Sequence, residues 1–410
     1  MSKVSYKDLL KKNLTSAEFD IIRSCSEVAV EFGYKIYLIG GVVRDLILGA
    51  KTKDIDITVE GDVCDFVRIL EKKISVKTVI FNKNLPTAKV RFDNDVEIDF
   101  ASTRNEIYPK RGELPVIVRT GTSLKEDVLR RDFTINALAL SLNNFENPEL
   151  IDYTGGVADL KNKQIRVLHD KSFYDDPSRL IRALKFSLRY GFEPEKGTLE
   201  LQKQYLENPL KNIPLKRVKD EMTETFSGES YVPYDEFIKQ KLYKIFFDNL
   251  SVRITGKDIY NLISVFETKK EDISLLYFLP LFFGQNIPEK LNLTNREITV
   301  INSVNKFLKE PPLFSSDIEI KEYFDGKDYL ICIFYGLLFD RKTAEKYFSE
   351  LSKVNLLING NDLKNLGIKE GKIYKELMKK VLAKKIESGF KTKQEEINYL
   401  KKLLKNFKNQ

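Results

Sequence analysis

The chain has 410 residues and a formal net charge of +8, a length that accommodates about two to four domains with a sizeable core. Its 3 cysteines, Cys25, Cys64 and Cys332, are far apart and odd in number, which argues against a disulfide framework or a cysteine-rich zinc site. The sequence lacks a signal-peptide pattern and its longest apolar runs are too short to span a bilayer, so we expect a cytoplasmic protein with no membrane partner.

Residues 1–35 are predicted to be helical and to lead into an apolar strand at 36–39. A double glycine, Gly40-Gly41, follows that strand, and then a short amphipathic helix carries Arg44. Glycines have no Cβ, so their backbone N–H groups can approach phosphate oxygens, and a cation near a helix N-terminus adds to an anion site. This turn is therefore predicted to bind phosphate.

Two aspartates, Asp54 and Asp56, begin a β-type run at 54–59. Side chains at positions i and i+2 of a strand share a face, so the two carboxylates project together while Ile55 and Ile57 face the core. Carboxylates this close repel each other unless a cation lies between them, and Mg²⁺ prefers carboxylate and phosphate oxygens. With the glycine turn, the pair predicts a site for a nucleoside triphosphate and Mg²⁺; the alternative is a tight turn beside a solvated acidic strand end.

A hairpin is predicted from two β-type runs, 89–92 and 95–100. In its second strand Glu97 and Asp99 share one face, and either could supply a third carboxylate to the metal site. Asp99 is preferred as a catalytic residue because it lies nearer the strand end.

Residues 103–122 contain proline and glycine among charged residues and are interpreted as an irregular, mobile loop. From Asp127 to residue 139 the chain is predicted to be helical. Within this segment Arg130 and Arg131 point in different directions, so one is expected to hold triphosphate while the other pairs with a neighbouring acid. Asn136 can donate and accept hydrogen bonds with a sugar hydroxyl. The alternative is a helix terminus with surface ion pairs.

A strand-turn-strand segment is predicted at 151–168, followed by a helix whose N-cap is Asp176. Arg179 and Arg182 lie three residues apart on one side of that helix. An Asp and an Arg at this spacing fit the edge of a nucleobase, the carboxylate accepting from an exocyclic amine and the guanidinium donating to ring acceptors. Capping and base recognition are compatible, because a carboxylate has lone pairs for both. His169 is the single histidine, so no histidine metal cluster is possible.

After residue 176 the pattern is helical nearly to the end, and composition changes predict boundaries near 165, 228 and 312. We therefore predict a head at 1–165, a helical neck at 166–228 for base recognition, a helical body at 229–312 and a helical basic tail at 313–410. Residues 371–410 contain 12 Lys and 4 Glu. A basic end of this kind indicates a polyanionic partner, or else the solvated helix faces of a lysine-rich protein.

Five motifs occur in one order along the chain: GGxVRD…DxD at 40–56, RRDFTxNA at 130–137, D-(Y/F)-x-x-G-x-x-D-L at 152–160, (E/D)-D-x-x-R-x-x-R-x-x-R-F at 175–186, and a weak match to I-S-x-E-R-I-x-x-E at 213–221. In these motifs the chain resembles the class II tRNA nucleotidyltransferases, or CCA-adding enzymes, and the related bacterial poly(A) polymerases. The stretches 360–363 and 366–368 are similar to the tail of many members.

The resemblance implies an α+β protein with a polymerase-β-like nucleotidyltransferase head containing a mixed β-sheet, followed by an all-helical neck, body and tail. It implies that Asp54 and Asp56 bind Mg²⁺, that Asp176 and Arg179 act as a protein template selecting CTP and then ATP, and that tRNA is the partner. Nucleotide contacts are expected from Gly40, Gly41, Arg44, Arg130, Arg131, Asn136, Asp176, Arg179, Arg182 and Lys185.

The implied reaction is template-independent addition of CCA to the tRNA 3′ end, in which the 3′-hydroxyl attacks the α-phosphate and pyrophosphate leaves. CC-adding relatives lack a flexible loop between the first two motifs, so a loop at 103–118 favours addition of the terminal A as well. An enzyme that adds only A, or only CC, is the alternative, and nucleotidylation of an antibiotic or protein would not require the Asp176/Arg179 pair. A poly(A) polymerase is disfavoured because its basic signature after the first motif is missing.

The chain departs from the family pattern at four positions. Asp175 replaces the commoner Glu, and Lys185 replaces the last Arg of its motif and so loses a planar fork. Pro214 and Lys216 replace the Ser and Glu of the last motif, so 213–221 is assigned no role.

Overall fold

The computed structural model describes residues 5–52, 54–82, 84–228 and 230–408, and the chain divides into two compact units. The first unit comprises residues 1–221 and 236–247, and the second comprises residues 222–235 and 248–410. The finer division into head, neck, body and tail stays a prediction.

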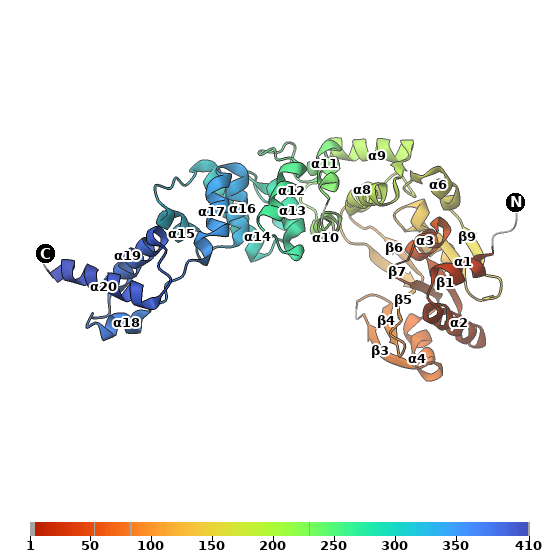
Figure 1. Cartoon of the computed structure of the whole chain (residues 1–410). Coiled ribbons are helices and arrows are strands. Elements are labelled where there is room, and N and C mark those ends of the chain that lie inside the picture. The colour runs from red at the N-terminus through yellow and green to blue at the C-terminus, as the bar shows by residue number, and fades with distance from the viewer. Residues whose placement is uncertain (1–4, 53, 83, 229, 409–410) are drawn as a thin grey trace. The chain divides into compact units, whose positions relative to one another are not determined.

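A seven-stranded mixed sheet forms the centre of the first unit (Figure 1), with strand order β3-β4-β5-β2-β1-β8-β9. Neighbouring strands are antiparallel except β2 and β5, which run parallel. The strands are β1 (Lys35–Ile39), β2 (Asp56–Glu60), β3 (Val76–Phe81), β4 (Thr87–Phe92), β5 (Glu97–Ser102), β8 (Leu138–Ser141) and β9 (Glu149–Asp152). This architecture confirms the predicted α+β fold, and the β4–β5 pair confirms the predicted hairpin.

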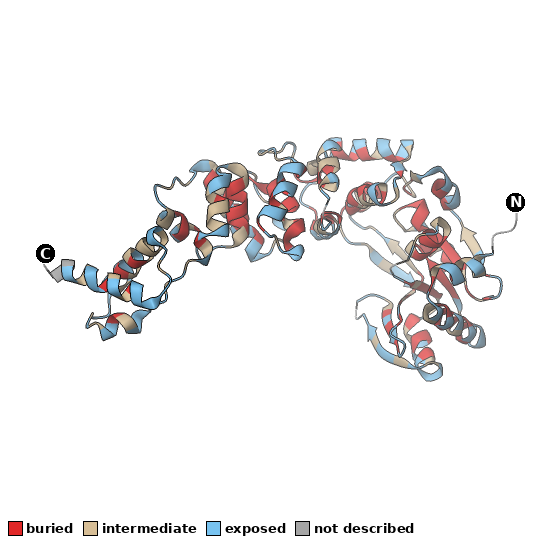
Figure 2. Cartoon of the chain, viewed as in Figure 1, coloured by how far each residue is buried: buried red, intermediate tan, exposed pale blue. Residues whose placement is uncertain are grey.

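Burial along the strands follows from where each strand lies in the sheet. In β4 and β5 buried residues alternate with more exposed ones, whereas central β1 is buried from Ile36 to Ile39 (Figure 2). Helices α2 and α3 pack on β1, and α4 packs on β4 and β5. The four helices of this region are α1 (Tyr6–Asn13), α2 (Ser16–Glu31), α3 (Gly41–Leu48) and α4 (Val63–Lys73).

The rest of the first unit consists of further strands and helices. They are β6 (Arg104–Ile107), β7 (Val116–Thr120), α5 (Leu124–Leu129), the 3₁₀ helix η1 (Thr134–Asn136), α6 (Gly156–Asn162), β10 (Gln164–Ile165), α7 (Ser172–Asp175), α8 (Ser178–Tyr190), β11 (Glu193–Pro194), α9 (Lys196–Glu207) and η2 (Leu242–Ile245). Helices α10 (Lys216–Thr225) and α11 (Val232–Lys239) contain residues of both units.

The expected irregular loop at 103–122 is wrong, because β6 and β7 pair as an antiparallel hairpin. Pro109 and Gly112 lie between the two strands, where a hairpin tolerates them. Proline and glycine therefore mark the tip of a paired segment here. The predicted turn at 151–168 is also wrong, since α6 occupies its centre.

The expected helix from residue 127 to 139 is wrong as well. Helix α5 ends at Leu129, and Phe133 is extended and forms a bridge with Val167. The Thr134 N–H donates to the Arg166 carbonyl at 2.9 Å. The backbone therefore bonds to a distant segment in place of its own helix, and the chain enters β8 after one 3₁₀ turn.

The regular elements of the second unit are all helices within the described part of the chain. Its elements are α12 (Gly256–Val265), η3 (Lys270–Asp272), α13 (Ile273–Phe278), η4 (Leu279–Phe282), η5 (Glu289–Leu291), α14 (Asn295–Lys309), α15 (Asp317–Phe324), α16 (Tyr329–Leu338), α17 (Arg341–Ser349), η6 (Leu351–Lys353), α18 (Gly360–Asn365), α19 (Lys372–Ser388) and α20 (Lys393–Lys408). Apolar α16 is buried and packs on α12, α14 and α17. A separate apolar cluster, containing Leu363, Leu377 and Leu400, joins α18 to α19 and α20.

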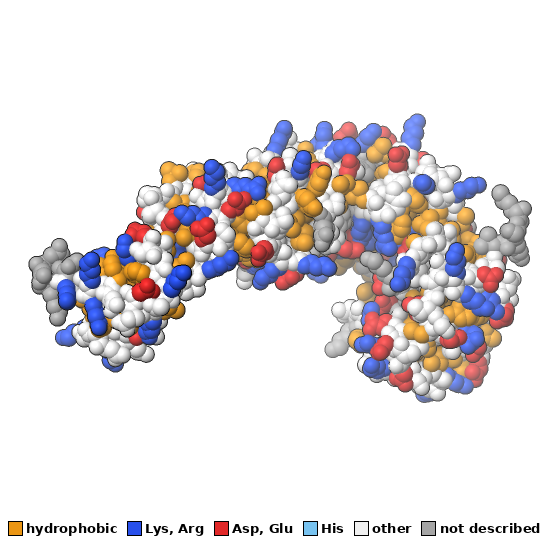
Figure 3. Space-filling view, in the orientation of Figure 1, with side chains coloured by type: hydrophobic (Ala, Val, Ile, Leu, Met, Phe, Trp, Pro, Cys, Tyr) orange, Lys and Arg blue, Asp and Glu red, His pale blue; other side chains and the backbone are white. Residues whose placement is uncertain are grey.

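Lysine side chains dominate the surface of α19 and α20 (Figure 3), in line with the 12 Lys among residues 371–410. Among the described residues, no helix is both long and apolar enough to cross a bilayer.

Candidate active site

The double glycine forms the turn between β1 and α3. Gly40 has φ +74°, in the left-handed region that favours glycine, and its N–H donates to the Leu138 carbonyl at 2.9 Å. A Cβ at Gly40 would lie 3.0 Å from Arg131 Nη1. The turn thus brings the start of α3 against the arginine pair that follows α5.

The predicted acidic residues meet at the parallel pair β2–β5, where Asp56 is in register with Asp99. Asp54 lies two residues before Asp56, and Ile55 and Ile57 are buried as predicted. Burial raises the pKa of Asp56 to about 6; the charge of Arg131 opposes this rise, and those of Asp99 and Asp54 add to it. Asp99 also pairs with Lys89 Nζ at 3.2 Å.

These carboxylates fit a hard divalent cation. Mutual repulsion of Asp54, Asp56 and Asp99 is the cost that a bound cation would relieve, and all their donor atoms are oxygen. Within the described residues, no group of three His, Cys, Asp or Glu side chains is close enough to enclose a metal. The assignment of Mg²⁺ to these carboxylates therefore stays a prediction.

Arg130 and Arg131 both contact the fully buried carboxylate of Asp127, at 2.7 and 3.1 Å. The expectation that only one of them pairs with an acid is therefore wrong. The two arginines still differ, because Arg130 has a further acidic neighbour, Glu106, at 3.4 Å. Arg131 Nε is instead buried with no hydrogen-bond partner in the described part of the chain.

A chain of polar contacts runs from α3 to α10 through the arginine motif and α8. Arg44 donates to Asn136, Asn136 to Asp132 at 3.1 Å, and Arg182 to Asp132 at 2.7 Å. Arg182 and Lys185 then donate to the two oxygens of Glu221, at 2.7 and 2.6 Å. Burial alone would raise the pKa of Asp132, but the Arg182 charge and the hydrogen bonds lower it to about 2.

Arg44 is buried at the start of this chain. Its guanidinium lies over the rings of Phe186 and Tyr190, with distances of 5.2 and 4.7 Å to the ring centroids, and its Nε donates to Asp45 at 2.9 Å. Tyr190 also donates to Asp45 at 2.9 Å. The expected nucleotide contact of Arg44 therefore stays a prediction, and the observed contacts tie α3 to α8.

The predicted N-cap position of Asp176 is wrong by one residue, because Pro177 is the N-cap of α8 and Asp176 ends α7, although Asp176 still accepts hydrogen bonds from the first residue of α8. Its Oδ1 accepts from Ser178 N at 3.1 Å and Ser178 Oγ at 2.7 Å, at the start of α8. Its Oδ2 is paired with Arg217 Nη2 of α10 at 2.7 Å. Arg179 donates to Ser172 Oγ at 2.7 Å and to the Arg130 carbonyl at 3.2 Å, and lies near Tyr108.

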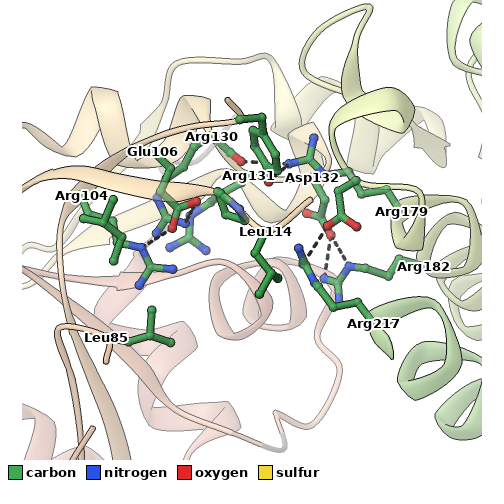
Figure 4. Close-up of a pocket in the computed structure, with 14 residues that line it drawn as sticks. Leu85, Arg104, Glu106, Leu114, Arg130, Arg131, Asp132, Arg179, Arg182 and Arg217 are labelled. Carbon is green, nitrogen blue, oxygen red and sulfur yellow. Dashed lines mark hydrogen bonds and ion pairs between the residues drawn. The ribbon is translucent and has the colours of Figure 1, made fainter. Parts of the chain in front are cut away.

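A cavity of about 490 Å³ connects these residues (Figure 4). Six of its lining residues are arginines, three are acids, and most of the rest are apolar. They are Arg104, Arg130, Arg131, Arg179, Arg182, Arg217, Glu106, Asp132, Asp176, Tyr108, Leu85, Leu114, Pro115 and Ile117. Such a lining suits a ligand with several negative charges and one planar, partly apolar group.

The structure sorts the predicted residues into three places. Arg130, Arg131, Asp176, Arg179 and Arg182 line the cavity. Asp54 and Asp99 line a separate hollow beside Lys89. Arg44, Asn136 and Lys185 belong to the chain of polar contacts that runs from α3 to α10. Gly41 follows Gly40 in the turn. Asp56 connects the two regions, because the charge of Arg131 acts on it.

Sequence reasoning missed several residues of the site. Arg217 and Glu221 lie in the segment that was assigned no role, although they are positions at which 213–221 does match its motif. Asp127 and Tyr108 belong to no motif, and an acid four residues before an arginine was the available signal for Asp127.

Comparison with known proteins identifies similar sequences and structures. Residues 36–166 match the model of the Poly A polymerase head domain. An A-adding tRNA nucleotidyltransferase of Geobacter sulfurreducens is 30% identical over 95% of this chain and 47% of its own length. Another of the same name, from Halalkalibacterium halodurans, is 27% identical over 96% of this chain and 94% of its own. Shorter matches include enzymes named CC-adding.

The chain thus spans less than half of the Geobacter relative but nearly all of the Halalkalibacterium one. The solved structure of a CCA-adding enzyme in an apo form superimposes with a TM-score of 0.82 at 25% identity, covering 98% of this chain and 99% of that one. Residues 36–166 are therefore similar to the poly A polymerase head domain, and the chain as a whole has the fold of the CCA-adding enzymes.

Proposed function

We propose that this chain is a template-independent tRNA nucleotidyltransferase that adds CCA to the tRNA 3′ end, using CTP and then ATP in the cytoplasm. The observation that carries the proposal is the arginine-rich cavity, because Asp176, Arg179 and Arg131 line it together. The names of the relatives support the same reaction class.

In the proposed reaction, the tRNA 3′-oxygen forms a bond to the α-phosphorus as the bond to pyrophosphate breaks. Asp54 and Asp56, with Asp99 beside them, would hold Mg²⁺. When bound, Mg²⁺ would lower the pKa of the attacking hydroxyl and stabilise charge on the reacting oxygens. Positioning and electrostatics carry such a reaction, so no nucleophilic side chain is required.

The arginine pair is proposed to bind the triphosphate. Arg131 is suited to this because its charge acts on Asp56 and its Nε has no hydrogen-bond partner among the described residues. The backbone of the Gly40 turn lies beside Arg131, and a Cβ at this position would crowd the Arg131 guanidinium. Arg130 stays against Asp127 and Glu106 and holds the motif in place.

Base selection is proposed to lie with Asp176 and Arg179. A carboxylate accepts from the amino group that cytosine and adenine share, and a guanidinium donates to their ring acceptors; uracil lacks that amino group. Arg182 and Lys185 would support this end of the cavity through Asp132 and Glu221. The lysine-rich helices α19 and α20 are proposed to bind tRNA phosphates.

Addition of only the terminal A is a second candidate. Two relatives that match along nearly the whole chain are both named A-adding. Addition of CC alone has no comparable support, and the β6–β7 hairpin keeps a loop at 108–115 beside the cavity.

One assay tests the proposal. The protein is incubated with tRNA transcripts ending at the discriminator base, at C or at CC, with CTP and ATP supplied separately and together, and product length is read on a gel. Full CCA addition extends all three substrates when both nucleotides are present. Extension of the CC-ended tRNA alone establishes the A-adding alternative, and no extension of any tRNA contradicts both.

A further inference from the structure

The two residues proposed to read the base, Asp176 and Arg179, differ in the residues that they already contact. Arg179 is buried and its contacts come from Ser172, the Arg130 carbonyl and Tyr108. Asp176 is equally buried, but its Oδ2 faces a side chain that is 46% exposed, Arg217. Arg217 is therefore the more exposed partner of the ion pair with Asp176.

Arg217 gives Asp176 the same kind of hydrogen bond, from an N–H donor, that we expect from a base. Oδ1 of Asp176 already accepts two hydrogen bonds from Ser178, which leaves Oδ2 as the oxygen for any ligand. Arg217 donates an N–H to Oδ2 at 2.7 Å, as the amino group of cytosine or adenine would. Arg217 also lines the cavity (Figure 4), so its guanidinium takes up space that a base would need.

We infer that Arg217 is a specificity-determining residue that occupies the base-reading oxygen of Asp176 until a nucleotide bearing an amino group displaces it. The inference rests on the proposed function of this cavity. A base with an amino donor replaces the hydrogen bond that it breaks, whereas uracil presents a carbonyl to the carboxylate and therefore leaves the Arg217–Asp176 pair in place. Arg217 thus competes with CTP for Oδ2 and does not compete with UTP. It weakens the binding of CTP more than the binding of UTP.

Equilibrium binding of CTP and UTP to the full chain, without tRNA so that no transfer occurs, tests the inference. In Arg217→Ala the CTP Kd is expected to fall about fivefold, since a partly exposed ion pair no longer competes for Oδ2. The UTP Kd changes less, because UTP does not displace Arg217 in the wild type and meets an unpaired carboxylate in the variant. The ratio of UTP Kd to CTP Kd therefore rises. Lys216→Ala, a loss of the same charge one residue earlier on α10, is the matched control and should leave the ratio unchanged.

Each other outcome has a distinct meaning. An equal loss of affinity for both nucleotides makes Arg217 a phosphate contact and overturns the inference. A fall in the ratio means that Arg217 orients Asp176 for reading, which also overturns it. Asp176→Ala separates the inference from the proposed function: if that change leaves the wild-type ratio intact, the cavity does not read bases through Asp176 and the proposed function itself fails. Thermal unfolding of each variant shows that it is folded.

Discussion

Two groups of aspartates in the first unit have opposite electrostatic surroundings. Asp54, Asp56 and Asp99 lie near one another on β2, β5 and the segment before β2, and burial with mutual repulsion raises the pKa of Asp56 to about 6. Asp127 and Asp132 are each paired with arginines, and the pKa of Asp132 is lowered to about 2. The first group is therefore suited to bind a cation from solution. The carboxylates of the second group are already paired with arginines of the protein.

The largest effect is expected from the first group. Asp56→Asn should lower the single-turnover rate of nucleotide addition about a thousandfold or more, because the charge that would hold Mg²⁺ beside the reacting phosphate is lost. Binding of tRNA, measured on filters, should persist. Asp95→Asn removes an exposed carboxylate near the same hollow and should leave the rate unchanged. A near wild-type rate in Asp56→Asn would show that Asp56 does not hold a catalytic Mg²⁺.

The next largest effect is expected on the preference for CTP over UTP. Asp176→Ala should reduce the preference for CTP over UTP about tenfold to a hundredfold, because the acceptor for the amino group is gone. The measurement is kcat/KM for each nucleotide with tRNA as the acceptor. Asp170→Ala, an exposed carboxylate six residues earlier, is the control. Unchanged selectivity in Asp176→Ala would leave this residue as a helix cap.

The second group should matter for stability. Asp132→Asn is expected to lower the free energy of unfolding in urea by about 2–4 kcal/mol, because Arg182 loses a carboxylate partner in a largely buried position. The folded pKa lies below the unfolded value, so folded Asp132 binds fewer protons between about pH 4 and pH 2 and its contribution fades as pH falls through that window. The gap between wild type and variant should narrow there; a gap that is constant from pH 5 to pH 2 is inconsistent with the pairing.

The smallest effect is expected at Lys185. Lys185→Arg restores the residue common in the motif and keeps a donor for Glu221, so the free energy of unfolding should change by less than about 1 kcal/mol. Lys185→Met removes the donor and should cost more than Lys185→Arg. Equal unfolding curves for the two variants would show that the contact with Glu221 contributes nothing to stability.

Much of the fold and the site could be predicted because the relevant signals are local. Alternation around Ile55 and Ile57 identified a strand with Asp56 on the other face, and the glycines marked a turn that the φ of Gly40 requires. The start of a helix just after Asp176 was predicted from Pro177, although the N-cap is Pro177 itself.

The errors arose where distant segments decide local structure. Phe133 and Thr134 bond to 166–167, so a sequence with helical periodicity becomes a 3₁₀ turn and a strand. Arg217 was passed over because its motif matches weakly, although its contact with Asp176 spans 41 positions of sequence and no local pattern indicates it. The assignment of Asp54, Asp56 and Asp99 as a metal site stays a prediction.

The most direct test of the contrast between the two groups uses Mn²⁺ as an EPR-visible substitute for Mg²⁺, titrated with CTP into three proteins. Wild type and Asp132→Asn should show protein-bound Mn²⁺ beyond that held by CTP alone, and the double variant Asp54→Asn/Asp56→Asn should lose it. Equal Mn²⁺ binding by wild type and the double variant would contradict the account.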